Sequence, residues 1–127
     1  ALPAKLREQQ IIFGKTGGLH AAALFNTHGE IILVREDVGR HNAVDKIIGA
    51  MLRRKKLLAN EMGIIVSGRT SFELMQKTIV AGIPMLAAVS APSSLAISLA
   101  EKFNVTLVGF LRNNKFNIYT SSKRINN

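Results

Sequence analysis

Short apolar runs alternate with amphipathic stretches of helical length across residues 62–110. The apolar runs have the size and aliphatic content of buried strands and comprise residues 63–66, 85–89 and 105–110. Between them, residues 71–81 and 92–103 repeat apolar side chains at helical spacing. This order predicts a parallel sheet with right-handed crossovers and helices on both faces.

Two hairpins are predicted on either side of this region. Residues 19–25 and 30–35 are apolar runs joined by Asn26-Thr27-His28-Gly29, whose Asn and Gly suit a turn. At the other end, residues 116–119 form a strand that returns after the last buried run. The hairpins add antiparallel pairing, so the sheet is expected to be mixed.

Two further helices complete the predicted order. Residues 3–10 carry a proline near the first turn, and residues 42–56 repeat apolar side chains at helical spacing. We therefore predict one α/β domain over residues 1–127, built as a three-layer α/β/α sandwich around a mixed, mostly parallel sheet.

The composition excludes several classes of protein. The 127 residues are 47% hydrophobic, which argues against disorder, and no apolar run approaches the ~20 residues that span a bilayer. The first residues lack a signal-peptide pattern and begin with Ala1, which suggests a fragment. Without cysteine, the segment has no disulfide, thiolate zinc site or thiol nucleophile. We expect a cytoplasmic protein.

A net charge of +9 indicates that a binding partner would be negatively charged, but it does not identify the partner. Part of the charge is the run Arg53-Arg54-Lys55-Lys56, which is either a solvated helix end or a docking patch for an acidic or polyphosphate-bearing partner. Aromatic residues make up only 6% of the chain, and no stacking platform is evident, so DNA is not an expected partner.

Residues 35–46 place acids, bases, a histidine and a glycine between an apolar strand and an amphipathic helix. Asn42, with Asp45 three residues later, suits the N-cap of that helix and a variant of the capping box. Backbone N–H groups and the helix dipole favour an anion at such a point. A plain turn with solvated charges remains the alternative.

Polar, Gly- or Ser-bearing loops follow four of the predicted strands. In open parallel sheets the loops at the carboxyl ends of the strands form the ligand crevice. Arg40, Arg69 and Arg112 can bind phosphate oxygens with forked donors. This common placement favours a phosphate- or nucleotide-bearing ligand at one edge, contacted by the loops 36–41, 67–69, 90–94 and 112–115.

The histidines have different expected roles. His41, beside Arg40 and Asp37, is the best candidate for ligand contact or proton handling. His20 is either directed at a tight site or a satisfied core histidine, and His28 is a solvated turn residue. The three histidines lack carboxylates at a suitable spacing, so no metal site is predicted.

Eight segments of the chain, in order, match a known family: residues 16–22, 36–46, 67–69, 71–74, 76–77, 81–84, 88–92 and 107–110. Through these segments the chain resembles the formate dehydrogenase accessory sulfurtransferases, FdhD. The resemblance implies a cytidine-deaminase-like fold. It also implies a role in sulfurating the molybdenum cofactor, bis-molybdopterin guanine dinucleotide, before insertion into formate dehydrogenase, with sulfur arriving as a persulfide from a cysteine desulfurase. We further expect a homodimer that does not bind membranes.

The missing cysteine is a large departure from this family, whose persulfide cysteine lies in a Cys-x-x-Cys motif that precedes the matched segment. The chain therefore holds no catalytic residue of that kind. We expect it to be the carboxyl-terminal, cofactor-binding domain of a longer sulfurtransferase and to be inactive alone. The alternative is a cysteine-free module that binds guanine nucleotides or nucleic acid without transferring sulfur.

The resemblance assigns cofactor binding to Phe110, Leu111, Arg112, Asn113, Asn114 and Lys115. The placement of the loops adds His20, Asp37, Arg40, His41, Ser67, Arg69 and Ser90. A nucleoside deaminase is a rival within the same fold, but its His-x-Glu becomes His20-Ala21-Ala22 here and its zinc thiolates are missing, so no zinc is expected.

Overall fold

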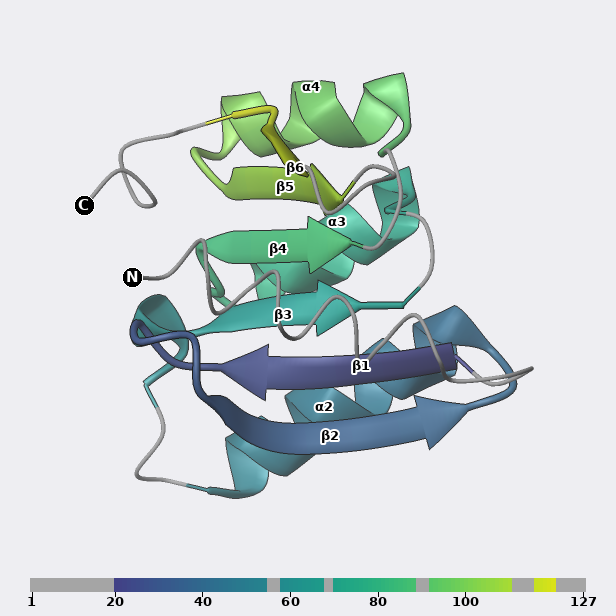
Figure 1. Cartoon of the computed structure of the whole chain (residues 1–127), viewed down its shortest axis with the longest axis vertical. Helices are drawn as coiled ribbons and strands as arrows, with labels where there is room; N and C mark the ends of the chain where they lie inside the picture. The colour runs from purple at the N-terminus through teal and green to yellow at the C-terminus, as the bar shows by residue number, and fades with distance from the viewer. Residues whose placement is uncertain (1–19, 55–57, 68–69, 89–91, 111–115, 121–127) are drawn as a thin grey trace.

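A computed structural model describes residues 20–54, 58–67, 70–88, 92–110 and 116–120 of the chain. Within this part, six strands form one sheet in the order β2-β1-β3-β4-β5-β6 (Figure 1). The strands are β1 (His20–Phe25), β2 (Ile31–Asp37), β3 (Gly63–Val66), β4 (Met85–Ala88), β5 (Thr106–Phe110) and β6 (Phe116–Ile118).

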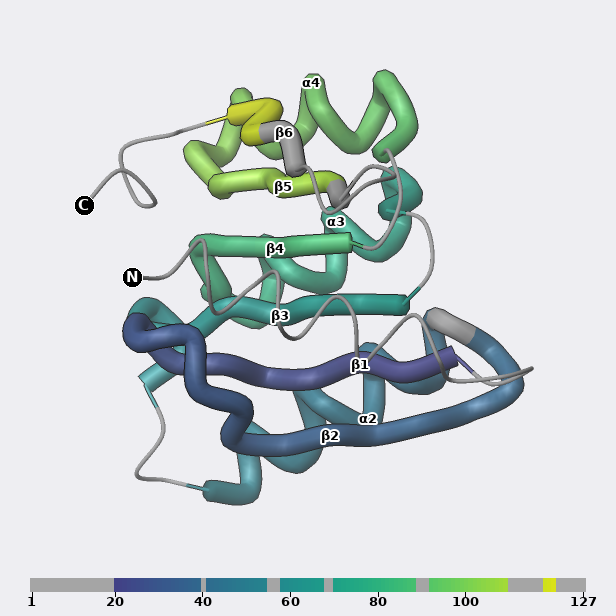
Figure 2. The backbone as a smooth tube through the Cα atoms, in the orientation of Figure 1, coloured from purple at the N-terminus to yellow at the C-terminus, as the bar shows by residue number. Residues whose placement is uncertain are grey.

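The sheet is mixed, as predicted. The strands β3, β4 and β5 pair in parallel, whereas β1 is antiparallel to both of its neighbours and β6 is antiparallel to β5. Because β1 lies between β2 and β3 (Figure 2), β2 points in the same direction as the three parallel strands. The carboxyl ends of β2, β3, β4 and β5 therefore lie at one edge, together with the start of β1.

Three helices cover one face of this sheet and lie behind it in Figure 1: α2 (Arg40–Arg53), α3 (Phe72–Val80) and α4 (Ser94–Lys102). A short 3₁₀ helix, η1 (Ala59–Glu61), leads into β3. The main core lies between the helices and the sheet and includes Leu24, Leu33, Val44, Ile47, Ile64, Leu74, Met75, Leu86, Ala96 and Leu107.

A second, smaller core occupies the opposite face of the sheet. Among the described residues, its side chains come from the strands, whose residues alternate between the two faces of the sheet. The predicted helix over residues 3–10 lies outside the described residues, so the second helical layer of the predicted sandwich stays a prediction. The residues of this core are Ala21, Ala23, Phe25, Ile65, Met85, Ala87 and Val108.

The ends of two helices carry residues that commonly begin or stop a helix. Ser93 caps α4 by accepting a hydrogen bond from Ala96 N at 3.1 Å, and Gly82, with φ +78°, follows α3. Thr70 and Glu73 are spaced as a capping box, which predicts Thr70 as the cap of α3, but Ser71 and not Thr70 accepts the bond from Leu74 N. In the described part of the chain, no helix has both the length and the apolar character needed to cross a membrane.

Candidate functional site

The loops that follow β3 and β4 are joined to their neighbours at the carboxyl edge. Ser67, directly after β3, accepts a hydrogen bond from Ala21 N on its hydroxyl at 2.9 Å and donates its own N–H to Ala21 O at 2.9 Å. Ser93 N donates to Thr70 O at 3.0 Å, which connects the starts of α3 and α4. The predicted convergence of strand ends is therefore confirmed for the described backbone.

Asp37 organises the turn between β2 and α2. Its Oδ1 atom accepts hydrogen bonds from Gly39 N at 3.0 Å and from Asn42 Nδ2 at 3.4 Å. The helix begins at Arg40 with Gly39 as its N-cap, so the predicted N-cap role of Asn42 is wrong. Asn42 lies inside the first turn because Asp37, at the end of β2, already binds Gly39, the residue that precedes the helix.

Lys46, one turn further along α2, neutralises Asp37. Lys46 Nζ lies 2.8 Å from Asp37 Oδ2 and donates to Glu36 O at 3.1 Å. The bond from Lys46, helped by the Gly39 N–H, lowers the pKa of Asp37 from 3.8 to about 2. Asp37 is therefore a structural anion that holds the turn, with its charge balanced by a neighbouring cation.

His20 lies beside Asp37 on the helix-covered face. The two residues are cross-strand partners in the β1–β2 register. Ala22 and Leu33, each an even number of residues away along the same strands, belong to the helix-side core, so His20 and Asp37 share that face. His20 is half-buried there. Of the two roles considered for His20, a position at the edge of the site fits this placement better than a core position.

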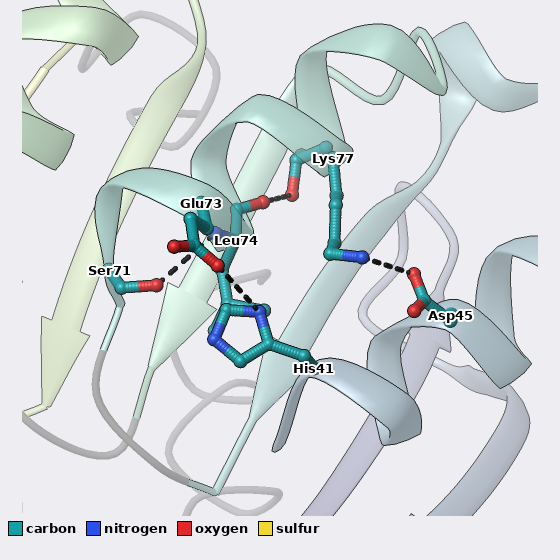
Figure 3. Close-up of polar contacts among 7 residues, drawn as sticks. His41, Asp45, Ser71, Glu73, Leu74 and Lys77 are labelled. Atoms are coloured by element: carbon teal, nitrogen blue, oxygen red, sulfur yellow. Dashed lines mark hydrogen bonds and ion pairs between the residues drawn. The ribbon is translucent and has the colours of Figure 1, made fainter. Parts of the chain in front are cut away.

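A polar seam joins α2 to α3 (Figure 3). Lys77 Nζ lies 2.7 Å from Asp45 Oδ1, and His41 Nδ1 lies 3.8 Å from Glu73 Oε2. The second distance is too long for a hydrogen bond, and the buried His41 Nδ1 atom has no partner in the described part of the protein. His41 thus faces α3 rather than Asp37, and its buried Nδ1 atom lies near the Glu73 carboxylate without a hydrogen bond.

The seam opens into an apolar groove towards the carboxyl ends of the two helices. The groove has a volume of about 820 Å³, and its apolar lining includes Ile48, Leu52, Val80 and Ala81. Leu52 and Val80 are 70% and 88% exposed. A second hollow of about 260 Å³ lies near Phe25 and Pro84 at the opposite edge of the sheet. Of the predicted site residues whose side chains the structure describes, none lines either hollow.

The structure describes the side chains of four predicted site residues: His20, Asp37, His41 and Ser67. It gives the backbone alone for Arg40, which opens α2, and for Phe110, which ends β5. The other predicted residues lie outside the described part of the chain, and their role stays a prediction: Leu111, Arg112, Asn113, Asn114, Lys115, Arg69 and Ser90.

Sequence reasoning missed three residues that shape this edge, namely Asn42 as a partner of Asp37, Lys46 and Glu73. A signal for Lys46 was present, because a basic residue in the second turn of a helix can reach back to the end of the preceding strand. Among the described residues, no group of three or more His, Cys, Asp or Glu side chains could hold a metal ion.

Comparison with known proteins gives consistent matches. The model of the FdhD/NarQ family matches residues 1–126. Proteins named sulfur carrier protein FdhD are 62% identical over 125 residues in Mycolicibacterium paratuberculosis and 55% identical over 125 residues in Sulfurisphaera tokodaii. The match covers 98% of this chain in both cases, but only 46% and 49% of the two relatives. The chain thus spans about half the length of the curated relatives it matches.

Two solved structures are similar to the chain. A formate dehydrogenase accessory protein from Desulfotalea psychrophila superposes with a TM-score of 0.81 at 30% identity, covering 98% of this chain and 55% of that protein. A guanine deaminase from Nitrosomonas europaea has a TM-score of 0.58 at 12% identity, covering 85% of this chain and 74% of that protein. The second likeness concerns the fold alone and confirms the predicted cytidine-deaminase-like architecture.

Proposed function

The chain belongs to the FdhD/NarQ family, and from this premise we propose that it is the cofactor-binding domain of a longer sulfur carrier protein. In this proposal the complete protein sulfurates the molybdenum cofactor, bound as bis-molybdopterin guanine dinucleotide, before the cofactor is inserted into formate dehydrogenase. The cofactor is the substrate of this reaction, and the 127 residues contribute its binding surface.

The observation that carries the proposal is the shared edge at which β2, β3, β4 and β5 end. Three helices start at this edge, and α2 has neither an acidic residue in its first turn nor a side-chain cap. Unpaired N–H groups at a helix start, together with the helix dipole, favour the phosphate groups of a dinucleotide. Phe110, the first of the residues that the family resemblance assigns to cofactor binding, ends β5 at the same edge.

The absence of cysteine separates binding from sulfur transfer. Persulfide transfer requires a sulfur nucleophile, and none of the 127 residues supplies one. We therefore assign the persulfide cysteine to the part of the relatives that this chain does not cover, where a cysteine desulfurase would load it. We also propose that the complete protein acts in the cytoplasm as a homodimer.

A pair of charge variants tests the proposed binding turn. Replacing Arg112 and Lys115 by alanine removes two cations that we propose contact the ligand, and each charge-assisted bond contributes roughly 1.5–3 kcal/mol. Affinity for GDP, measured by calorimetry, should fall by about tenfold or more. The matched control removes Arg53 and Arg54, which lie at the other end of α2, and should bind GDP like the parent.

The outcomes distinguish the proposal from its alternative, a cysteine-free module that binds nucleic acid through its charge. If both double variants lose the same affinity, binding reflects net charge alone and the alternative is favoured. In the complete protein, the Arg112/Lys115 variant should still accept labelled sulfur but fail to activate formate dehydrogenase. Stable labelling of the cysteine-free chain itself would contradict the assignment of the persulfide to the other half.

A further inference from the structure

Asp37 places a carboxylate at the edge that we propose binds an anion. Its negative charge is unfavourable for that role. An unbalanced negative charge beside the start of α2 would repel the phosphate groups of a nucleotide. The side chain of Asp37 is only 18% exposed, so water screens its charge poorly. Its position is nevertheless useful, because the Asp37 carboxylate holds Gly39 N, the backbone group that precedes the helix.

Lys46 resolves this conflict through two contacts of one ammonium group. Lys46 Nζ lies 2.8 Å from Asp37 Oδ2 and bonds Glu36 O at 3.1 Å. The first contact balances the carboxylate on the side away from Gly39, and the second ties the second turn of α2 to the backbone of β2. The end of the strand, the turn and the helix are thereby fixed together by a single side chain.

We propose that Lys46 is a positioning residue for nucleotide binding, which cancels the charge of Asp37 and fixes the β2–α2 turn so that the start of α2 can receive a phosphate group. The inference rests on the proposed function, because it concerns the same edge of the sheet. Lys46 acts through Asp37 and the turn, and it does not contact the nucleotide in this scheme.

The geometry favours this role over that of an ordinary surface ion pair. Exposed pairs usually contribute at most about 1 kcal/mol to stability and have a single contact. Asp45 and Lys77 form such a pair at 2.7 Å, on the seam between α2 and α3. Lys46 instead joins a carboxylate and a backbone carbonyl at the edge of the sheet, and the same carboxylate also accepts bonds from the turn and from Asn42.

The test compares GDP affinity, by calorimetry at neutral pH, in the parent and five variants of the 127-residue chain. Lys46→Met should weaken binding by about tenfold, because it leaves the Asp37 charge uncompensated. Lys46→Arg keeps the charge and should restore most of the affinity. Lys77→Met is the matched control, since it breaks a lysine–carboxylate pair away from the edge, and it should bind within about twofold of the parent. Urea unfolding verifies that each form is folded.

A second change at Asp37 separates charge from a merely structural effect. In the Lys46→Met background, Asp37→Asn removes the repulsion while its amide oxygen can still accept the Gly39 N–H, so affinity should recover. Lys46→Gln, which removes the positive charge but keeps a polar group, should weaken GDP binding in the same way, and this form keeps the test available if Lys46→Met does not fold.

Each result supports or overturns the inference. Binding by Lys46→Met or Lys46→Gln equal to that of the parent would overturn it, as would a double variant that binds no better than Lys46→Met. Failure of the parent chain to bind GDP would instead overturn the proposed function and this inference with it. Loss of affinity in Lys77→Met equal to that in Lys46→Met would show that no special role belongs to Lys46.

Discussion

Replacing Gly63 by alanine tests how tightly the second core is packed. Gly63 opens β3 opposite Phe25 of β1. A methyl group at Gly63 would lie 2.3, 2.6 and 2.9 Å from three atoms of the Phe25 ring, far inside van der Waals contact. Phe25 is 2% exposed, and its ring would have to shift within the packed core to admit the methyl group. Overpacking of this kind costs about 1–3 kcal/mol, whereas exchanging glycine for alanine in a strand returns roughly 0.5–1 kcal/mol.

The net loss in the free energy of unfolding should be about 1–2 kcal/mol, seen as a lower urea midpoint with an unchanged m-value. The control is Phe25→Leu, which removes the ring atoms that the methyl group meets. In that background Gly63→Ala should cost at least about 1 kcal/mol less, as expected for two residues in contact. GDP affinity should not change, since Gly63 lies at the edge opposite the proposed site. A Gly63→Ala chain as stable as the parent, or an equal loss in both backgrounds, would refute this packing.

Three other perturbations should affect stability in different ways. Ser67→Ala leaves the partly buried Ala21 N–H without its acceptor and should lower the unfolding free energy by about 1–3 kcal/mol; no change in a urea titration would contradict this. Because the pKa of Asp37 is lowered to about 2, its contribution is present above pH 4 and is lost as the pH falls from about 4 to 2. Asp37→Asn should therefore flatten that part of the stability–pH curve, which acid titration by circular dichroism measures. Thr120→Val removes a buried hydroxyl that bonds two backbone groups at the start of β5, and thermal unfolding should reveal a loss of about 1–3 kcal/mol; an unchanged melting temperature would argue against this bridge.

The sequence predicted the elements best where local and global signals agree. The run Gly63–Val66 is bounded by a glycine and a serine and is apolar throughout, and it forms β3 with those bounds. The first hairpin was also predicted, because a clear turn separates its two strands. The second strand, β2, extends to Asp37, beyond the predicted end at residue 35. Strand order was harder to predict, because the insertion of β1 between β2 and β3 depends on contacts between residues distant in sequence.

The predicted N-caps of two helices were wrong, because another residue nearby binds the start of the helix instead. Thr70 and Ser71 are both good N-cap residues, and tertiary packing buries Thr70 so that Ser71 takes the role. At α2, Asn42 had a capping pattern, but Asp37 at the end of the strand fixes the turn earlier. In both cases the deciding contact involves the sheet or a neighbouring element, which a local pattern does not contain.

The candidate site could be predicted as an edge but not as a set of contacts. Strand direction alone brings His20, Asp37 and Ser67 to the same edge. That the Ser67 hydroxyl pairs with the backbone of β1 depends on a register between residues 46 positions apart. That His41 faces Glu73 depends on how α2 packs beside α3, and the sequence pattern did not indicate this packing.

The central claim is that this cysteine-free domain recognises a guanine dinucleotide at the carboxyl edge of its sheet. Calorimetric titration of the chain with GDP and with ADP, at low and at higher salt, measures this most directly. We predict that GDP binds more tightly than ADP. The affinity for GDP should fall as the salt concentration rises, because phosphate contacts contribute to it. Equal affinities for the two nucleotides, or no binding of either, would contradict the claim.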